Sequence, residues 1–186
     1  MKQIDFDHGT VTGNILGVAL PMLVAQILSL LYNIVDRIYI ARIPSVGTTA
    51  LGAVGLCFPI IVIITAFSNL FGSGGAPLFS INRGKGNIKK AEVIMNTSFS
   101  MLCICGVALM VIGMLFASSI LMLFGASEEG LSYAYPYMMI YLIGIVPSMI
   151  ATGMNPFINA QGYATSGMLS VTIGAVANLI LDPLFI

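Results

Sequence analysis

Charged residues are scarce in this chain. Only 8% of its 186 residues are Asp, Glu, Lys or Arg, and seven acidic side chains balance seven basic ones. Soluble domains carry about 25% charged residues, so this composition argues against a soluble globular protein. The balanced charge also leaves no basic surface of the kind that binds nucleic acid, and we expect no such partner.

Side chains that commonly carry covalent or metal chemistry are also few. The chain has a single His, and its three cysteines, Cys57, Cys103 and Cys105, all lie in apolar segments. They show neither the spacing of a zinc site nor a disulfide framework. Because a free cysteine behaves as a small hydrophobic residue, buried structural thiols are the simplest interpretation.

Long apolar runs dominate what is present. Hydrophobic residues make up 58% of the sequence, and a membrane-spanning helix needs roughly 20 of them in succession. The runs are continuous rather than alternating, which favours helices over the strands of a barrel. We therefore predict an all-α integral membrane protein with five transmembrane helices. The spans cover about 13–41, 50–80, 90–123, 132–158 and 165–186.

Most of the cations gather in one short loop. Arg83, Lys85, Lys89 and Lys90 lie between the second and third spans, and Lys2 falls on the same side after two crossings. Lys and Arg are enriched in cytoplasmic loops. We therefore predict a multi-pass protein of the plasma membrane, with this loop and the N-terminus in the cytoplasm.

Two aspartates lie in stretches that otherwise read as spanning helix. Asp36 stands in LLYNIVDRIYIA and Asp182 in ANLILDPLFI, both in the outer half of the membrane under this orientation. A carboxylate at membrane depth costs about 2.5 kcal/mol or more, so it usually faces a bundle interior or a wet cavity. Such residues commonly mark ion sites or proton relays, which makes a transporter the first hypothesis. The two can meet only if the first and fifth spans are neighbours.

Further oxygen ligands accompany the second aspartate. Asn178 lies one turn before Asp182, so the two side chains share a helix face. Pro183 lacks the amide that would bond the carbonyl oxygen of Leu179. Together with Asp36, these hard oxygen ligands suit a small hard cation such as Na⁺, or a proton network, and not a soft metal.

Each polar residue also has a structural interpretation. Asp36 could be an interfacial residue satisfied by Arg37, although neighbours at i and i+1 point different ways. Asn178 could instead hold two helices together. Paired membrane aspartates also serve intramembrane aspartyl proteases, but these need a Gly-x-Gly-Asp context where this chain has Leu-Asp-Pro. No nucleophile stands beside a base either, and we expect no enzymatic activity.

Several sequence stretches follow one another in an order found in one transporter family. They are ALPML, YNIVDRIYIA, ALGAVGLCFPI, GSGGAPLFSINRGKGN and INAQGYATSGMLSVTIGAVANLILDPLFI. Across essentially the whole chain they resemble the multidrug and toxic compound extrusion (MATE) family. The resemblance implies a twelve-helix, two-lobe antiporter, of which residues 1–186 would form a partial six-helix lobe, the amino-terminal one. Since Ile186 closes the sequence inside an apolar segment, we expect a fragment that lacks the carboxy-terminal half.

The resemblance also implies roles for single residues. In that family, the residues matching Asp36, Asn178 and Asp182 form a site for sodium or protons. The tyrosine matching Tyr137 lines the same cavity, although an aromatic belt at the membrane interface is an equal alternative for this residue. The proline matching Pro21 lies where the first helix can bend.

The implied function is secondary active efflux of organic, often cationic, compounds in exchange for Na⁺ or H⁺. No cofactor is implied beyond this coupling ion. The alternative is the flipping of a lipid-linked sugar by a related fold, but such flippases tend to carry basic cavities. The expected partners are a small organic substrate, the lipid bilayer and the missing carboxy-terminal half.

Overall fold

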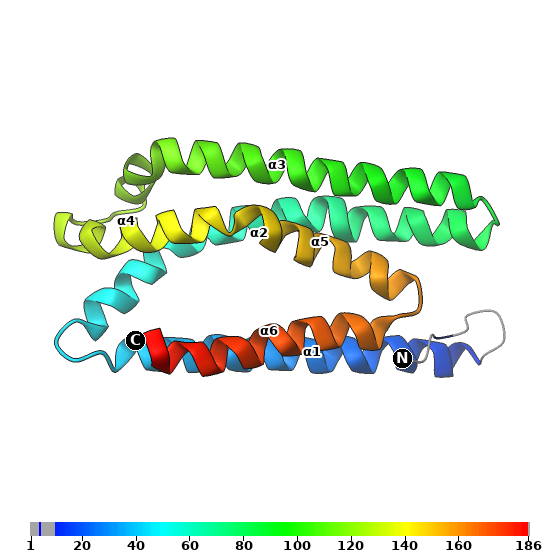
Figure 1. Ribbon diagram of the computed structural model, residues 1–186, viewed down its shortest axis with the longest axis horizontal. Coiled ribbons are helices and arrows are strands. Elements are labelled where there is room, and N and C mark those ends of the chain that lie inside the picture. Colours follow the sequence, from blue (N-terminus) through cyan, green and yellow to red (C-terminus); the bar gives the residue numbers. More distant parts are fainter. Residues whose placement is uncertain (1–3, 5–9, 186) are drawn as a thin grey trace.

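The described part of the chain is helical almost from end to end. A computed structural model describes residues 4 and 10–185, with 182–185 described by their backbone alone. Within these residues the helices are α1 (Val11–Ala41), α2 (Gly47–Gly84), α3 (Ile88–Leu123), α4 (Glu128–Ile143), α5 (Ile145–Ala160) and α6 (Ala164–Phe185) (Figure 1). The predicted all-α class is confirmed.

Four of these helices are long and apolar enough to cross a membrane on their own. They are α1, α2, α3 and α6, and the described residues allow up to five spans if α4 and α5 together form one. This pair, which covers the predicted fourth span, is bent by 57° at Gly144. Pro147 explains the bend, because it has no amide to bond the carbonyl oxygen of Ile143.

Polar side chains fix where several helices begin. The hydroxyl oxygen of Thr10 accepts a hydrogen bond from the amide of Gly13, and Ser127 does the same for Gly130. The side-chain oxygen of Asn87 accepts from the amide of Lys90 at the start of α3. Such caps satisfy first-turn amides that have no partner within the helix. The turns between helices therefore stay short.

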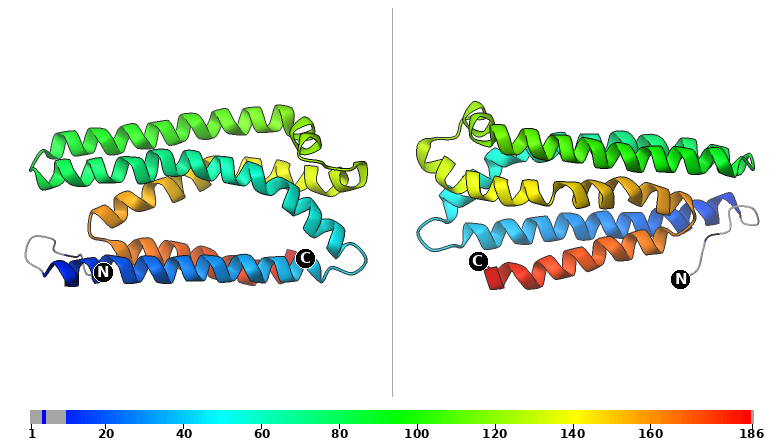
Figure 2. Two further views of the ribbon diagram at one scale, coloured as in Figure 1. Left: turned by 180° about the vertical axis from the view of Figure 1, so that it is seen from behind. Right: turned by 45° about the horizontal axis from the view of Figure 1, so that its top comes forward.

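The helices form two layers. The main hydrophobic core lies among α2, α3, α4 and α5 and includes Leu102, Leu121, Met138 and Leu142, all almost fully buried. The helices α1 and α6 pack chiefly on each other and lie beside this bundle (Figures 1 and 2). The helix α1, which is described in full, has no buried residue. The faces of α1 that do not pack on α6 are therefore open to lipid, water or other partners.

One crossing in the bundle is unusually close. A methyl group added to Gly72 of α2 would run into the backbone of Gly153 in α5. A methyl group on Gly153 would in turn overlap the side chain of Leu102 in α3. Small residues of this kind let membrane helices approach each other closely. The two glycines therefore set how α5 sits against α2 and α3.

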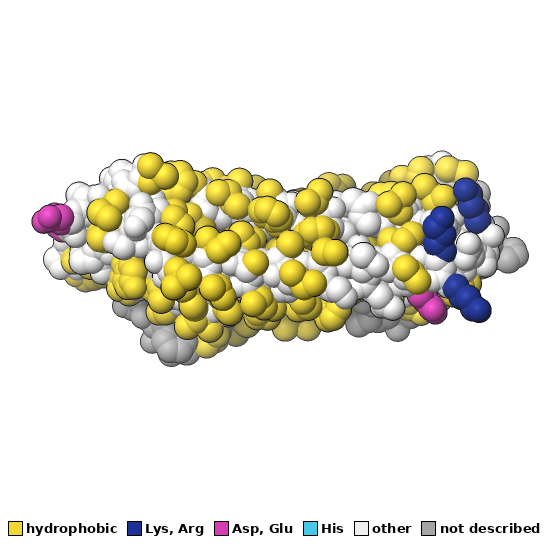
Figure 3. All heavy atoms as spheres, turned by 90° about the horizontal axis from the view of Figure 1, so that it is seen from above, with side chains coloured by type: hydrophobic (Ala, Val, Ile, Leu, Met, Phe, Trp, Pro, Cys, Tyr) yellow, Lys and Arg dark blue, Asp and Glu magenta, His cyan; other side chains and the backbone are white. Residues whose placement is uncertain are grey.

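The two ends of the molecule differ in charge. Arg83, Lys85, Lys89 and Lys90 lie around the turn between α2 and α3, at the end where α1 begins. Lys and Arg side chains gather at this end in Figure 3, and acidic side chains mark the opposite one, where α4 begins with Glu128 and Glu129. Lys2, which was also counted in the prediction of sidedness, lies outside the described residues.

Candidate functional site

The first and last helices lie side by side and run in the same direction (Figures 1 and 2). Asp36 stands in the last two turns of α1 and Asp182 in the last turn of α6. The helix segments that carry the two aspartates therefore approach the same end of the molecule as neighbours. The side chain of Asp182 lies outside the described part of the chain.

Asp36 lies between α1 and the bundle. Its carboxylate is half-buried and is close enough to Tyr137 of α4 for the two side chains to interact electrostatically. One turn deeper on each helix, Tyr32 of α1 stands in the same relation to Tyr141. These side chains of α1 and α4 lie within electrostatic range of one another, and Arg37 lies within the same range of Tyr137. Tyr137 is partly buried and packs against the hydrophobic core of the bundle, and its role in lining a cavity stays a prediction.

Tyr32 and Tyr141 were not predicted as site residues. Each shares a helix face with a predicted one, because Tyr32 and Asp36 lie four residues apart, as do Tyr137 and Tyr141. This spacing is the signal in the sequence that could have revealed them. It became informative only once the structure brought these side chains of α1 and α4 within electrostatic range of one another.

Asn178 contributes a buried oxygen from α6. Among the described atoms, its side-chain oxygen has no hydrogen-bond partner. A buried acceptor left unpaired costs about 1–3 kcal/mol, so a donor or a cation is expected to complete this site. The atom belongs to the hard oxygen class that Na⁺ prefers.

The ligands available for a cation are oxygen atoms of mixed type. In the part of the chain that the structure describes, no three His, Cys, Asp or Glu side chains come together. A cation held by Asp36 would therefore also need amide, phenol or backbone oxygens. Asn178 on the adjoining α6 is one described residue with a suitable oxygen, and Tyr137 on α4, within electrostatic range of Asp36, is another.

Pro21 lies in the first half of α1, away from these residues. The helix continues without a break from Val11 to Ala41 through this position. The missing amide of Pro21 leaves the carbonyl oxygen of Gly17 without its helical bond, which weakens the helix locally. In this structure Pro21 is a weak point in a continuous helix.

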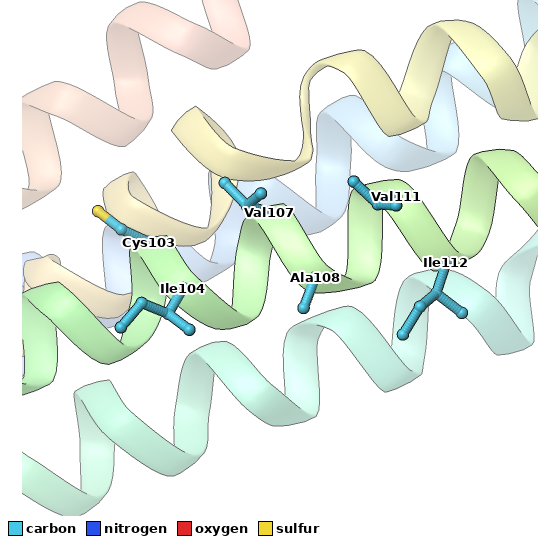
Figure 4. A pocket seen from close by; sticks show the side chains of 6 residues that line it. All are labelled: Cys103, Ile104, Val107, Ala108, Val111 and Ile112. Atoms are coloured by element: carbon cyan, nitrogen blue, oxygen red, sulfur yellow. The ribbon is translucent and has the colours of Figure 1, made fainter.

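A separate hollow lies on the outer face of α3 (Figure 4). It is lined by Cys103, Ile104, Val107, Ala108, Val111 and Ile112. These side chains are apolar or only weakly polar and all come from one helix, several of them largely exposed. A lipid chain is the expected occupant of such a surface, and the hollow does not belong to the candidate site.

Comparison with known proteins adds independent information. Residues 21–184 match the sequence profile of the MatE family. The chain is 28% identical over 183 residues to a protein of Shewanella oneidensis named FAD transporter, a match that covers 96% of this chain and 40% of that protein. It is 26% identical over 181 residues to the multidrug export protein MepA of Staphylococcus haemolyticus, covering 97% and 40%.

Solved structures support the same relationship. A crystal structure of a MATE protein in complex with MaD5 matches this chain with a TM-score of 0.90 at 25% identity. The match covers 100% of this chain and 41% of that one. The chain therefore spans about two fifths of the length of the relatives it matches.

Proposed function

Because this chain belongs to the MatE family of membrane transporters, we propose that it forms part of an antiporter that exports organic compounds in exchange for Na⁺ or H⁺. The observation that carries the proposal is the packing of α6 along α1, which sets the helix of Asn178, whose buried oxygen has no partner among the described atoms, beside the helix of Asp36. Asp36 also lies within electrostatic range of Tyr137. Asp182 would complete this site, since it shares a helix face with Asn178.

The chemistry of the site accounts for exchange. A charged carboxylate at membrane depth is costly, and so is a buried amide oxygen without a partner. A Na⁺ bound by Asp36 and Asn178 would lower both costs, whereas a proton on Asp36 would remove the charge. Either would favour the conformation that packs tightly around it. A ligand can shift a conformational equilibrium only by its difference in affinity between the two states. Binding of the coupling ion would supply that difference.

Pro21 would be the residue at which α1 bends during transport. Alternating access requires helices to move around a central site, and α1 is weakest where the bond from residue 21 to Gly17 is absent. Since the polar end of α1 lies beyond this point, bending there would move Asp36 relative to α4 and α6.

We propose that the protein lies in the plasma membrane and that its cationic end lies in the cytoplasm. Arg83, Lys85, Lys89 and Lys90 support this by the enrichment of Lys and Arg in cytoplasmic loops. The further partners we propose are the lipid bilayer, a small organic substrate and a second lobe. The second lobe is supported by the coverage of about two fifths of the relatives.

Two other functions are less well supported. The relatives are named as a multidrug export protein and an FAD transporter, which does not favour the flipping of a lipid-linked sugar. The second function is that of an enzyme, and it is not favoured because the relatives are named as transporters. The FAD transporter also adds flavin nucleotides to the candidate substrates.

The test is ion-driven efflux in proteoliposomes that contain this chain together with the second lobe of a relative. We expect Asp36→Asn to abolish efflux of ethidium driven by a Na⁺ or pH gradient, because the neutral amide cannot exchange charge with the ion. The control is Glu129→Gln, which removes an exposed carboxylate at the start of α4 and should leave efflux unchanged. Normal ion-dependent efflux in Asp36→Asn would refute the assignment.

A further inference from the structure

A second polar feature of α1 lies apart from the aspartate. Gln26, Ser29, Asn33 and Arg37 recur every three or four residues and so occupy one face of the helix. With two aliphatic side chains and Phe58 of α2, they line an open pocket of ≈ 580 Å³. We call this the α1 pocket.

The polar row reaches deep into the membrane. Arg37 stands near the end of α1, and Gln26 lies 11 residues earlier, or roughly 16 Å along the helix axis. Gln26, Asn33 and Arg37 are all exposed. The guanidinium of Arg37 and the amide of Gln26 are costly to place against hydrocarbon, so lipid is a poor occupant for this face. Water or a polar solute suits it better.

The charge of the α1 pocket is opposite to that of the aspartate site. Among the described residues that line it, Arg37 alone is charged. Asp36 is adjacent in sequence but does not line the pocket, because successive residues on a helix point about 100° apart. The pocket is therefore suited to an anion, while the aspartate site is suited to a cation.

The side chains of the pocket are arranged to hold an amphipathic molecule. The guanidinium of Arg37 lies 5.8 Å from the centre of the Phe58 ring, a cation–π contact that steadies its position. A guanidinium offers paired donors that match a carboxylate or a phosphate. The Asn33 amide donates to the carbonyl oxygen of Ser29 at 2.7 Å, which fixes its orientation. Leu30, Ile34 and the Phe58 ring provide an apolar wall.

We propose that the α1 pocket binds organic anions with a flat apolar body, with the acidic group on Arg37 and the body against the apolar wall. The inference rests on the proposed transport function and gives its substrate class. The acidic site around Asp36 is then left to the coupling cation. Flavin mononucleotide represents the class, and riboflavin is its matched control, because it has the same ring system without the phosphate.

The experiment measures binding to the purified chain in lipid nanodiscs, without any ion gradient, by fluorescence anisotropy of the flavin. We expect flavin mononucleotide to bind about tenfold or more tightly than riboflavin, the size expected for a charge-assisted contact. Arg37→Gln should lower the affinity for flavin mononucleotide to that for riboflavin. Arg42→Gln removes a cation at the same end but outside the pocket, and should change the affinity less than about twofold.

Two further variants keep the test decisive if the Arg37→Gln protein does not insert into the membrane. Phe58→Leu should weaken both flavins alike, since it removes ring contact but no charge. Arg37→Lys should retain only part of the preference for the phosphate, because lysine lacks the paired donors. Wild-type protein that binds the two flavins equally, or not at all, would overturn the proposal, as would unchanged binding in the Arg37 and Phe58 variants.

The outcome is separable from that of the proposed function. Asp36→Asn should abolish ion-driven efflux yet bind flavin mononucleotide no more weakly than wild type, because it removes a negative charge next to Arg37 and no side chain that lines the pocket. Ethidium bound more tightly than flavin mononucleotide, with Arg37→Gln improving ethidium binding, would show a pocket for cations. That result would refute the anion proposal while leaving cation exchange at Asp36 intact.

Discussion

At the scale of single residues, the membrane makes an unpaired polar atom informative. An amide exposed to water can always form hydrogen bonds with solvent. The side-chain oxygen of Asn178 is buried and has no hydrogen-bond partner among the described atoms. Asp36 is half-buried on α1, the helix that packs along α6. The buried oxygen of Asn178 costs stability unless an ion or a donor joins it. A residue kept only for structure would be expected to add stability, so a residue that costs stability is better explained by a functional role.

Asn178→Leu tests that explanation. Removing an unsatisfied buried acceptor should leave the free energy of unfolding unchanged or raise it by about 1 kcal/mol. The same change should abolish the ion dependence of efflux, because it deletes a proposed ligand. Thermal unfolding in nanodiscs and efflux in proteoliposomes give the two readouts. If Asn178 only held helices together, the variant would instead lose stability.

At the scale of helices, close packing sets how the bundle is assembled around the site. The crossing of α2 and α5 at Gly72 and Gly153 leaves no room for a methyl group. The bend after α4 turns α5 by 57°. A sequence that reads as one long apolar run thus becomes two helices, of which α4 carries the tyrosines within electrostatic range of α1 side chains. Packing between elements therefore positions the side chains near Asp36.

Gly72→Ala tests the close crossing. Overpacking of this kind should lower the free energy of unfolding by about 1–3 kcal/mol. The matched control is Gly74→Ala on the same helix, where an added methyl group would meet nothing within 4 Å. This control should be neutral or stabilise the helix by up to about 1 kcal/mol. Equal melting temperatures for the two variants would show that α2 and α5 are less tightly packed than described.

Pro21→Ala tests the proposed weak point of α1. Restoring the amide should allow the missing bond to the carbonyl oxygen of Gly17 and stiffen the helix. We expect slower ion-driven efflux with binding of the coupling ion retained, because only the movement is impeded. Efflux rates in proteoliposomes and Na⁺ binding to the purified protein separate the two effects. An undiminished efflux rate would show that α1 does not need to bend at this residue.

At the scale of the whole molecule, the two ends and the two layers define sidedness and surface. The turn between α2 and α3 is basic, and the start of α4 at the opposite end is acidic. The helices α1 and α6 lie beside the bundle and leave many apolar side chains exposed, as a lipid-facing protein does. The polar face of α1 is the exception and marks the surface proposed to bind substrate.

Labelling of single cysteines tests the orientation. After the native cysteines are replaced, Cys at position 85 should resist an impermeant thiol reagent applied to intact cells. Cys at positions 45 and 128, near the opposite end, should react with it. Permeabilised cells provide the control, since all three positions should then be labelled. Labelling in intact cells at 85 but not at 45 and 128 would reverse the predicted topology.

The sequence by itself determined the helical membrane class, the family and the residues with unusual chemistry. These follow from local properties: run length, charge content and polar groups at membrane depth. Only the tertiary structure decided which helices meet. It placed α1 beside α6 and brought Asp36 to Tyr137, and it joined Phe58 to the polar row of α1. Contacts between segments distant in sequence depend on how whole helix faces pack, and residue spacing along one helix does not encode that.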